Sequence, residues 1–221
     1  GPGAGVYPRS ARVNNAADGL PFSQPAENNS GPILGQLQRL LERAQSVVEL
    51  GAGTGQHAVA FARALPHLHW QPTEHPRSMA TLRPRCEAAA LANLAPPVAL
   101  DITARPWSGD WPDALYTANT LHIVSETVVE ALFAECGLRA RDASRLIVYG
   151  PFNYGGSYTS DSNARFDQWL AARDPHSAIR DFEAVDSLAA GAGFALMEDH
   201  AMPANNRLLL WRRQHAPAAD S

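Results

Sequence analysis

The sequence predicts a single α/β domain built on a mostly parallel sheet. Stretches of strand length alternate with amphipathic helical stretches along most of the chain, which is typical of a parallel sheet covered by helices on both faces. One apolar strand runs directly into a glycine-rich turn that opens a helix, as in Rossmann-like domains. The last two strands follow each other without a helix, so we expect a seven-stranded sheet with one antiparallel strand in a closing hairpin.

Composition supports this class and excludes others. The 221 residues suit one domain, and a hydrophobic share of 45% with a charged share of 18% is typical of a globular protein. The net charge is −4, all 18 basic residues are arginines, and no basic tract indicates a nucleic-acid partner. No apolar run approaches the roughly 18 to 20 residues that span a bilayer, and no signal-peptide pattern opens the sequence. We therefore expect a cytoplasmic monomer or homodimer in which Cys86 and Cys136 are reduced core thiols.

The N-terminal region is expected to be an irregular arm. Residues 1–29 are rich in Gly, Pro, Asn and Ser, and the first three residues resemble the remnant of a cleaved tag. Ser30 is a candidate helix cap, and Pro32 suits the first helical turn. Apolar residues from Ile33 to Ala44 then recur at helical spacing. The folded domain is therefore expected to span residues 30–215.

The remaining elements follow from the same periodicities. We expect strands at 46–50, 68–73, 97–100, 114–120, 145–150, 194–201 and 207–213. We expect helices at 56–65, 77–93, 125–139, 163–172 and 181–190. Residues 151–175 interrupt this rhythm and form an insertion after the fifth strand.

The glycine-rich turn predicts a nucleotide site. Glycine supplies backbone angles closed to other residues and lets a ligand lie against the main chain. The spacing is G-x-G-x-G after an acid, which indicates S-adenosylmethionine (SAM) rather than a dinucleotide with its G-x-G-x-x-G. The residues expected to contact SAM here are Glu49, Gly51, Ala52, Gly53, Gly55 and Gln56.

The next strand ends add polar groups, because ligands of open α/β sheets bind beyond the carboxyl ends of the strands. Glu74 lies near the spacing of about 20 residues at which a ribose-binding acid follows the glycine turn; the alternative is a solvated loop acid. Asp101 is a candidate partner of the adenine amino group, or a cap of the following turn, and Ile102 would pack on the ring.

The fourth strand ends in Asn119, which would lie under the methionine part of SAM, with Leu121 also at the cofactor. His122 would point toward the transferred methyl group as a general base; the alternative is a structural or orienting histidine. The fifth strand ends at Tyr149, which we place with His122 in the catalytic set.

Aromatic and amide side chains predict the acceptor pocket. Phe152, Tyr154 and Tyr158 would face the acceptor, with ordinary packing under a loop as the alternative. Four asparagines are candidate contacts from a lid: Asn28, Asn29, Asn205 and Asn206. A metal site is not expected, because no Cys or carboxylate joins the three histidines around residues 67–75 at ligand spacing.

Combined motifs from about residue 26 to 213 resemble one family. They are Glu49 to His57, Trp70-Gln71-Pro72, Ala118-Asn119 with Leu121-His122-Ile123, Tyr149-Gly150-Pro151-Phe152, Thr159-Ser160, Ser162-Asn163, Phe166-Asp167, Arg173-Asp174-Pro175, Ile179-Arg180-Asp181 and Met202 to Asn206. This set is similar to the methyltransferase-like 26 family, long catalogued as a domain of unknown function. The resemblance implies a class I SAM-dependent methyltransferase fold and leaves the substrate open.

Three residue patterns depart from the family, and the first and third of them indicate a specialised acceptor. Glu27-Asn28-Asn29-Ser30-Gly31 precedes Pro32 where the family has a basic pair, and Glu74 replaces a common Asp. After Phe152 the usual charged run is replaced by Asn153-Tyr154-Gly155-Gly156.

The sequence therefore predicts methyl transfer from SAM to an N, O or S atom of a small metabolite, with a heteroaromatic one as an option. Two alternatives stay open: a protein side-chain methyltransferase and a SAM-binding protein without catalysis. An NAD-dependent oxidoreductase is disfavoured by the loop spacing. Neither a nucleic acid nor a membrane is expected as a partner.

Overall fold

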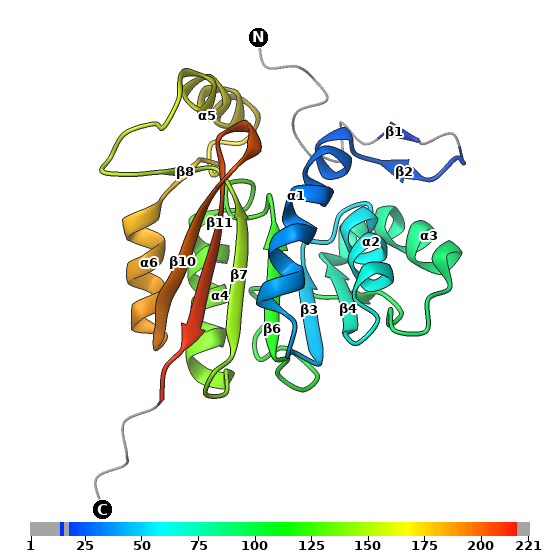
Figure 1. The fold of residues 1–221 in the computed structure, drawn as a ribbon. Helices are drawn as coiled ribbons and strands as arrows, with labels where there is room; N and C mark the ends of the chain where they lie inside the picture. The colour runs from blue at the N-terminus through cyan, green and yellow to red at the C-terminus, as the bar shows by residue number, and fades with distance from the viewer. Residues whose placement is uncertain (1–13, 16–17, 216–221) are drawn as a thin grey trace, which may run out of the picture.

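A computed structural model describes residues 14–15 and 18–215 and confirms the predicted Rossmann-like fold (Figure 1). Its seven-stranded sheet has the order β10-β11-β7-β6-β3-β4-β5. The five strands from β7 to β5 in this order run parallel, and β11 runs antiparallel to both of its neighbours. The strands are β3 (Ser46–Leu50), β4 (His69–Glu74), β5 (Val98–Ala99), β6 (Ala114–Ala118), β7 (Arg145–Gly150), β10 (Phe194–Met202) and β11 (Asn206–Arg213).

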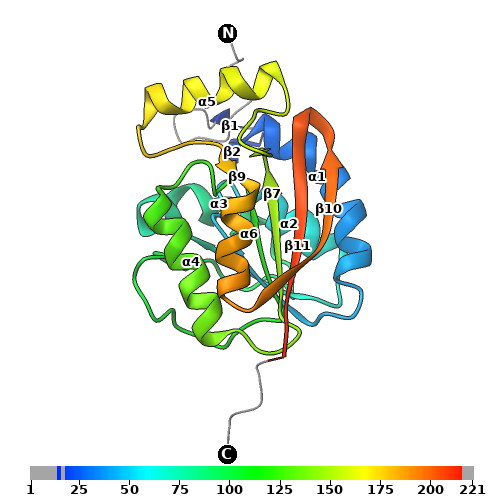
Figure 2. The same ribbon diagram turned by 90° about the vertical axis from the view of Figure 1, so that its left-hand side faces the viewer.

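Helices cover both faces of the sheet, as predicted. One face carries α1 (Gln24–Leu40), α2 (Gln56–Ala64) and α3 (Met79–Ala89), and the other carries α4 (Glu126–Arg139) and α6 (Phe182–Gly191). Figure 2 shows α4 and α6 in front of the sheet, with α5 (Asp161–Arg173) lying across the top. The expected tag remnant at residues 1–3 lies outside the described residues.

Strand alternation divides the buried side chains between two cores. On β6 and β7, Tyr116 and Ile147 pack with the helices α1 to α3, whereas Leu115 and Val148 pack with α4 and α6. This is the period of two that a fully covered strand requires. Because the parallel strands end at one edge of the sheet, the segments after β3, β4, β6 and β7 meet there.

The first helix begins earlier than the sequence predicted. It starts at Gln24 instead of Ser30, with Ser23 as the cap whose hydroxyl accepts a hydrogen bond from the Ala26 amide. Pro25 occupies the first turn, and Pro32 lies inside the helix rather than at its start. Part of the expected irregular arm is therefore helical. The Ser-x-Pro pattern at residue 23 carried the same capping signal as Ser30-Gly31-Pro32.

Several short elements were not predicted. β1 (Asn14–Asn15) pairs with β2 (Pro21–Phe22). β8 (Phe152–Asn153), at the start of the predicted insertion, pairs with β9 (Arg180–Asp181), which follows the insertion. Two-residue strands are too short for a periodic signal, so no pattern in the sequence indicates them. Turns η3 (Pro76–Ser78) and η4 (Pro203–Asn205) precede α3 and β11.

The glycine turn after β3 depends on close packing as well as backbone angles. Gly51 has φ of 64°, and a Cβ built on it would lie 2.6 Å from Thr120 Oγ1. Thr120 is held there by the Thr117 hydroxyl, which donates to Thr120 Oγ1 at 2.7 Å. Gly53, at φ of 58°, has no atom within 4 Å of its ideal Cβ and is open toward a ligand.

Replacing Gly51 with alanine should therefore destabilise the protein. Strain in the left-handed region and displacement of Thr120 together predict a loss of about 2–4 kcal/mol in the free energy of unfolding, measured by urea denaturation. Gly35→Ala is the matched control, because Gly35 is an exposed residue of α1 with open space around its Cβ. That substitution should gain about 0.5–1 kcal/mol. Equal effects at the two positions would contradict the packing role of Gly51.

Candidate functional site

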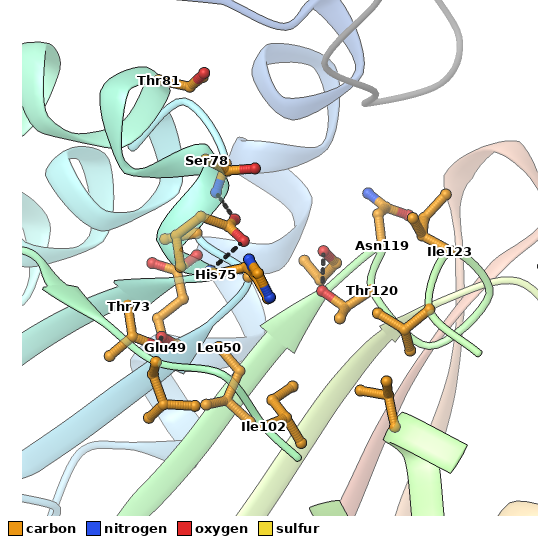
Figure 3. Close-up of a pocket in the computed structure, with 18 of the residues that line it drawn as sticks. Glu49, Leu50, Thr73, His75, Ser78, Thr81, Ile102, Asn119, Thr120 and Ile123 are labelled. Atoms are coloured by element: carbon orange, nitrogen blue, oxygen red, sulfur yellow. Dashed lines mark hydrogen bonds between the residues drawn. The ribbon is translucent and has the colours of Figure 1, made fainter. Parts of the chain in front are cut away.

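Two neighbouring cavities open where the parallel strands end. The first, of about 460 Å³, surrounds the turn after β3, and we call it the glycine-loop cavity. It is lined by eight of the residues that the sequence assigned to SAM: Glu49, Gly51, Ala52, Gly53, Glu74, Asp101, Ile102 and Asn119. Figure 3 shows Asn119, Thr120 and Ile123 on one side of this cavity, with Glu49, Thr73 and Ser78 on the other.

Glu74 ties the end of β4 to the glycine turn. Its Oε2 accepts a hydrogen bond from the Gly53 amide at 2.9 Å, and its Oε1 accepts one from the His75 amide at 2.8 Å. Each carboxylate oxygen has a second lone pair, so the group can still accept hydrogen bonds from a vicinal diol. Glu74 therefore combines a structural contact with a free binding capacity that faces the cavity.

Glu49 is a buried acid in the cavity wall. Trp70 Nε1 donates to its Oε1 at 3.1 Å, and only 2% of the residue is exposed. Burial raises the pKa of Glu49 to about 8; the hydrogen bond from Trp70 acts against this rise, and the negative charge of Glu74 adds to it. At neutral pH Glu49 is therefore mostly protonated in the ligand-free protein.

Asp101 and Ile102 lie at the far end of the cavity. The Thr103 amide and hydroxyl both donate to Asp101 Oδ1, at 3.0 and 2.8 Å, and these bonds lower the pKa of the carboxyl group. The cap role that the sequence offered as an alternative is thus present. Asp101 Oδ2 remains on the cavity side, 3.8 Å from His75 Nε2.

Three of the predicted cofactor residues do not line this cavity. Leu121 is buried in the core on the α4 side. Gly55 packs closely against α3, since a Cβ built on it would lie 3.0 Å from Cys86 Sγ. The Gln56 side chain accepts a hydrogen bond from the Ser23 amide at 2.6 Å and donates to the Ser23 carbonyl at 3.2 Å. Gln56 therefore fixes the start of α1 onto the start of α2 instead of facing a ligand.

The second cavity, of about 480 Å³, lies between α1, α5 and the hairpin of β10 and β11. We call it the asparagine cavity, because six of its lining residues are Asn28, Asn29, Asn119, Asn163, Asn205 and Asn206. Tyr149, Ser162 and Phe166 also line it. Asn119 lines both cavities, and its φ of 56° turns the chain sharply after β6. The sequence placed Asn28, Asn29, Asn205, Asn206 and Tyr149 near the acceptor, and the structure brings these five together.

A hydrogen-bond chain joins the two cavities through His57. Its Nε2 lies 3.1 Å from the Ala26 carbonyl and 2.8 Å from Asn29 Oδ1, while its Nδ1 lies 3.1 Å from the Tyr116 hydroxyl. Burial lowers the pKa of His57 to about 4, so the ring is neutral at pH 7. A carbonyl oxygen only accepts, so Nε2 carries the proton and Nδ1 accepts from Tyr116.

His122 does not reach either cavity. It is 3% exposed, and its ring meets Phe166 edge-on with centroids 5.3 Å apart. Its carbonyl accepts a hydrogen bond from the Ala178 amide. The general-base role predicted for His122 is thus not supported by its position, whereas the structural role that the sequence left open is consistent with it.

The three aromatic residues predicted at the acceptor also lie elsewhere. Phe152 is buried in the core on the α4 side. Tyr154 stacks on Phe182 and donates to Asp199 Oδ2 at 2.7 Å, and Tyr158 is an exposed residue that donates to Asp167. Their side chains are directed away because β8 turns the chain after β7 toward β9, a pairing that the sequence did not indicate.

Several lining residues were missed by sequence reasoning. The start of α1 supplies Ser23 and Ala26 to the glycine-loop cavity, and the loop after α5 supplies Asp174 and His176. Only the capping pattern at Ser23 gave a usable signal. In the part of the chain that the structure describes, no helix is long and apolar enough to cross a membrane. The same residues contain no group of three or more His, Cys, Asp or Glu side chains that could hold a metal ion.

The raised pKa of Glu49 predicts how the free energy of unfolding depends on pH. A raised pKa in the folded state means that Glu49 stabilises the fold below about pH 4.5 and that this stabilisation is lost as the pH rises toward 8. Glu49→Gln removes this ionisation, so the variant should gain stability relative to the natural protein by about 1 kcal/mol per pH unit between pH 5 and 8. Urea unfolding at several pH values measures the difference. A constant difference across this range would contradict the raised pKa.

Solved structures share the fold. An O-methyltransferase family protein from Burkholderia thailandensis matches with a TM-score of 0.75 and 17% identity, over 87% of this chain and 58% of that chain. The S-adenosylmethionine-dependent methyltransferase SibL matches with a TM-score of 0.72 and 23% identity, over 86% of this chain and 56% of that one. The mitomycin 7-O-methyltransferase MmcR matches with a TM-score of 0.74 and 18% identity, over 86% and 55%. The chain spans a little over half the length of these proteins.

The fold is therefore the class I methyltransferase fold, as the sequence predicted. The more specific resemblance to the methyltransferase-like 26 family stays a prediction. A family match extends over residues 20–213, and this chain belongs to the family described as "Protein of unknown function (DUF938)".

Proposed function

We propose that this protein is a SAM-dependent methyltransferase that acts on a small molecule. The charge of the glycine-loop cavity carries this proposal. Besides the mostly protonated Glu49, three carboxyl groups line it, from Glu74, Asp101 and Asp174, together with one arginine, Arg77. SAM bears a sulfonium and an ammonium charge against one carboxylate, so an acidic cavity favours it electrostatically.

The turn itself disfavours a dinucleotide. In dinucleotide sites the pyrophosphate is bound by the amides of the glycine turn and the first turn of the following helix. Here the Gly53 amide already donates to a carboxylate of Glu74, and the start of α2 is covered by Ser23 through Gln56. A pyrophosphate would therefore meet a negative charge and a closed helix end.

Each end of the cavity suits one part of SAM. Glu74 would accept hydrogen bonds from the ribose hydroxyls, and Asp101 with Ile102 would hold the adenine ring. Glu49, Gly51 and Asn119 would hold the methionine part, next to the asparagine cavity. When bound, SAM supplies an electrophilic methyl group.

The asparagine cavity is the proposed acceptor site, because Asn119 lines both cavities. Holding two reactants in line is worth up to roughly 7–11 kcal/mol, so a methyl transfer needs little beyond orientation and exclusion of water. The helices α1 and α5 and the tip of the β10–β11 hairpin would supply this enclosure. The named activity of MmcR on mitomycin supports a small-molecule acceptor by similarity of fold. The atom methylated, N, O or S, and a cytoplasmic location stay predictions.

Calorimetric titration of the full chain with SAM, S-adenosylhomocysteine and NAD tests the cofactor. We expect both sulfur nucleotides to bind and NAD not to bind, because of the carboxylate on the Gly53 amide. NAD binding alone, or no binding of either sulfur nucleotide, would overturn the proposal. Binding of SAM without turnover of any small acceptor would favour the non-catalytic or the protein-modifying alternative.

Glu74→Ala tests the ribose contact. Loss of a charged hydrogen-bond acceptor should weaken SAM binding by about 1–3 kcal/mol, or about 5- to 150-fold in Kd. Glu87→Ala is the matched control, since Glu87 is an exposed acid of α3 outside both cavities, and it should leave Kd unchanged. If the two variants bind SAM equally, Glu74 does not contact the cofactor.

A further inference from the structure

The asparagine cavity differs from its neighbour in carrying no charge. Among the residues described, its lining consists of amide, hydroxyl, aromatic, proline and alanine side chains. The glycine-loop cavity is lined by four carboxyl groups and an arginine. A charged acceptor group would lose hydration in the asparagine cavity without gaining an opposite charge, which disfavours its binding.

The orientation of Asn29 follows from His57. Because His57 Nε2 carries a proton toward the Ala26 carbonyl, the Asn29 atom 2.8 Å from it is the acceptor Oδ1. The Nδ2 group of Asn29 can then donate to the Tyr149 hydroxyl, since both residues line the asparagine cavity and Asn29 lowers the pKa of Tyr149.

Tyr149 is consequently a donor and not a base. Burial raises the pKa of its hydroxyl, while the hydrogen bonds from Asn206 and Asn29 lower it, as bonds donated to the phenol oxygen do. Tyr149 lines the cavity, and its neutral hydroxyl carries one proton that a ligand there can accept. No side chain of this lining titrates near neutral pH in the described part of the chain.

We propose that the asparagine cavity binds an uncharged heteroaromatic molecule that accepts a hydrogen bond from Tyr149 and is methylated on an atom with a free electron pair, such as a ring nitrogen. This inference rests on the proposed methyltransferase function. The electron pair of that nitrogen forms the bond to the methyl carbon while the carbon–sulfur bond breaks and its electrons stay on sulfur. The positive charge thus moves to the acceptor atom at the boundary marked by Asn119, next to the carboxyl-lined glycine-loop cavity, and no proton has to be removed by the protein.

Matched pairs of probes test the charge preference. With the protein saturated with S-adenosylhomocysteine, ligand-observed NMR titrations compare nicotinamide with nicotinate, and quinoline-4-carboxamide with quinoline-4-carboxylate. We expect the uncharged member of each pair to bind at least about 10-fold more tightly, because only the carboxylate must be desolvated without an opposite charge. Equal or tighter binding of the carboxylates, or binding of no uncharged probe, would overturn the proposal.

Tyr149→Phe tests the hydrogen bond. This variant keeps the ring and removes the donor, so it should weaken the uncharged probes about 5- to 50-fold while the carboxylates change little. The Kd for SAM of the variant should remain that of the natural protein, while its thermal unfolding midpoint should fall, because Tyr149 is buried and its neighbouring amides lose an acceptor. Unchanged probe affinity would remove Tyr149 from the site. Failure of the natural protein to bind SAM would instead overturn the proposed function itself.

Discussion

The position of α1 depends on the side chains that open α2, and both cavities depend on the position of α1. Gln56 pairs with the amide and the carbonyl of Ser23, and His57 binds the Ala26 carbonyl and Asn29. These contacts place Ser23 and Ala26 in the wall of the glycine-loop cavity and Asn28 and Asn29 in the wall of the asparagine cavity. Buried hydrogen bonds of this kind are costly to break one at a time, because the remaining partner is left unsatisfied.

The two cavities differ in the charge of their linings. The carboxyl groups lie around the glycine turn, where a cationic cofactor is proposed, and the amides lie between α1, α5 and the β10–β11 hairpin. Asn119 lies at the boundary between the two cavities, and its backbone amide donates a hydrogen bond to the Tyr149 backbone carbonyl at 2.9 Å. A single strand end therefore positions side chains in both cavities, as is usual for a site at the end of an open parallel sheet.

The main architecture was predictable because the sequence marks it by the periodic spacing of apolar residues and by glycines at turns. Strand alternation gave the sheet, and the glycines marked a turn that only residues tolerant of positive φ can form. The acidic strand ends at Glu74 and Asp101 followed from the rule for open α/β sheets. The predicted start of α1 was wrong because Ser23 and Ser30 carry the same capping signal, and the local sequence does not show which serine caps the helix.

The acceptor side was predicted less well for a different physical reason. Whether Phe152 and Tyr154 face a cavity depends on where β8 directs the chain, and that depends on pairing with Arg180 and Asp181 far along the sequence. His122 likewise lies against Phe166 because α5 folds over the strand ends. Such contacts between distant segments leave no local pattern. Asn28, Asn29, Asn205 and Asn206 lie in segments that the family resemblance singled out. The position of Asn29 depends on His57, which the sequence indicated only within the glycine-turn motif.

The neutral state of His57 makes this arrangement insensitive to ordinary changes in pH. With its pKa near 4, the ring keeps one proton on Nε2 and one free electron pair on Nδ1 throughout the physiological range. A protonated ring would donate from both nitrogens, and the bond from the Tyr116 hydroxyl would be lost. Burial of His57 therefore fixes which end of the Asn29 amide faces Tyr149. The orientation of an amide in the wall of the asparagine cavity is thus determined by His57, a buried residue at the start of α2.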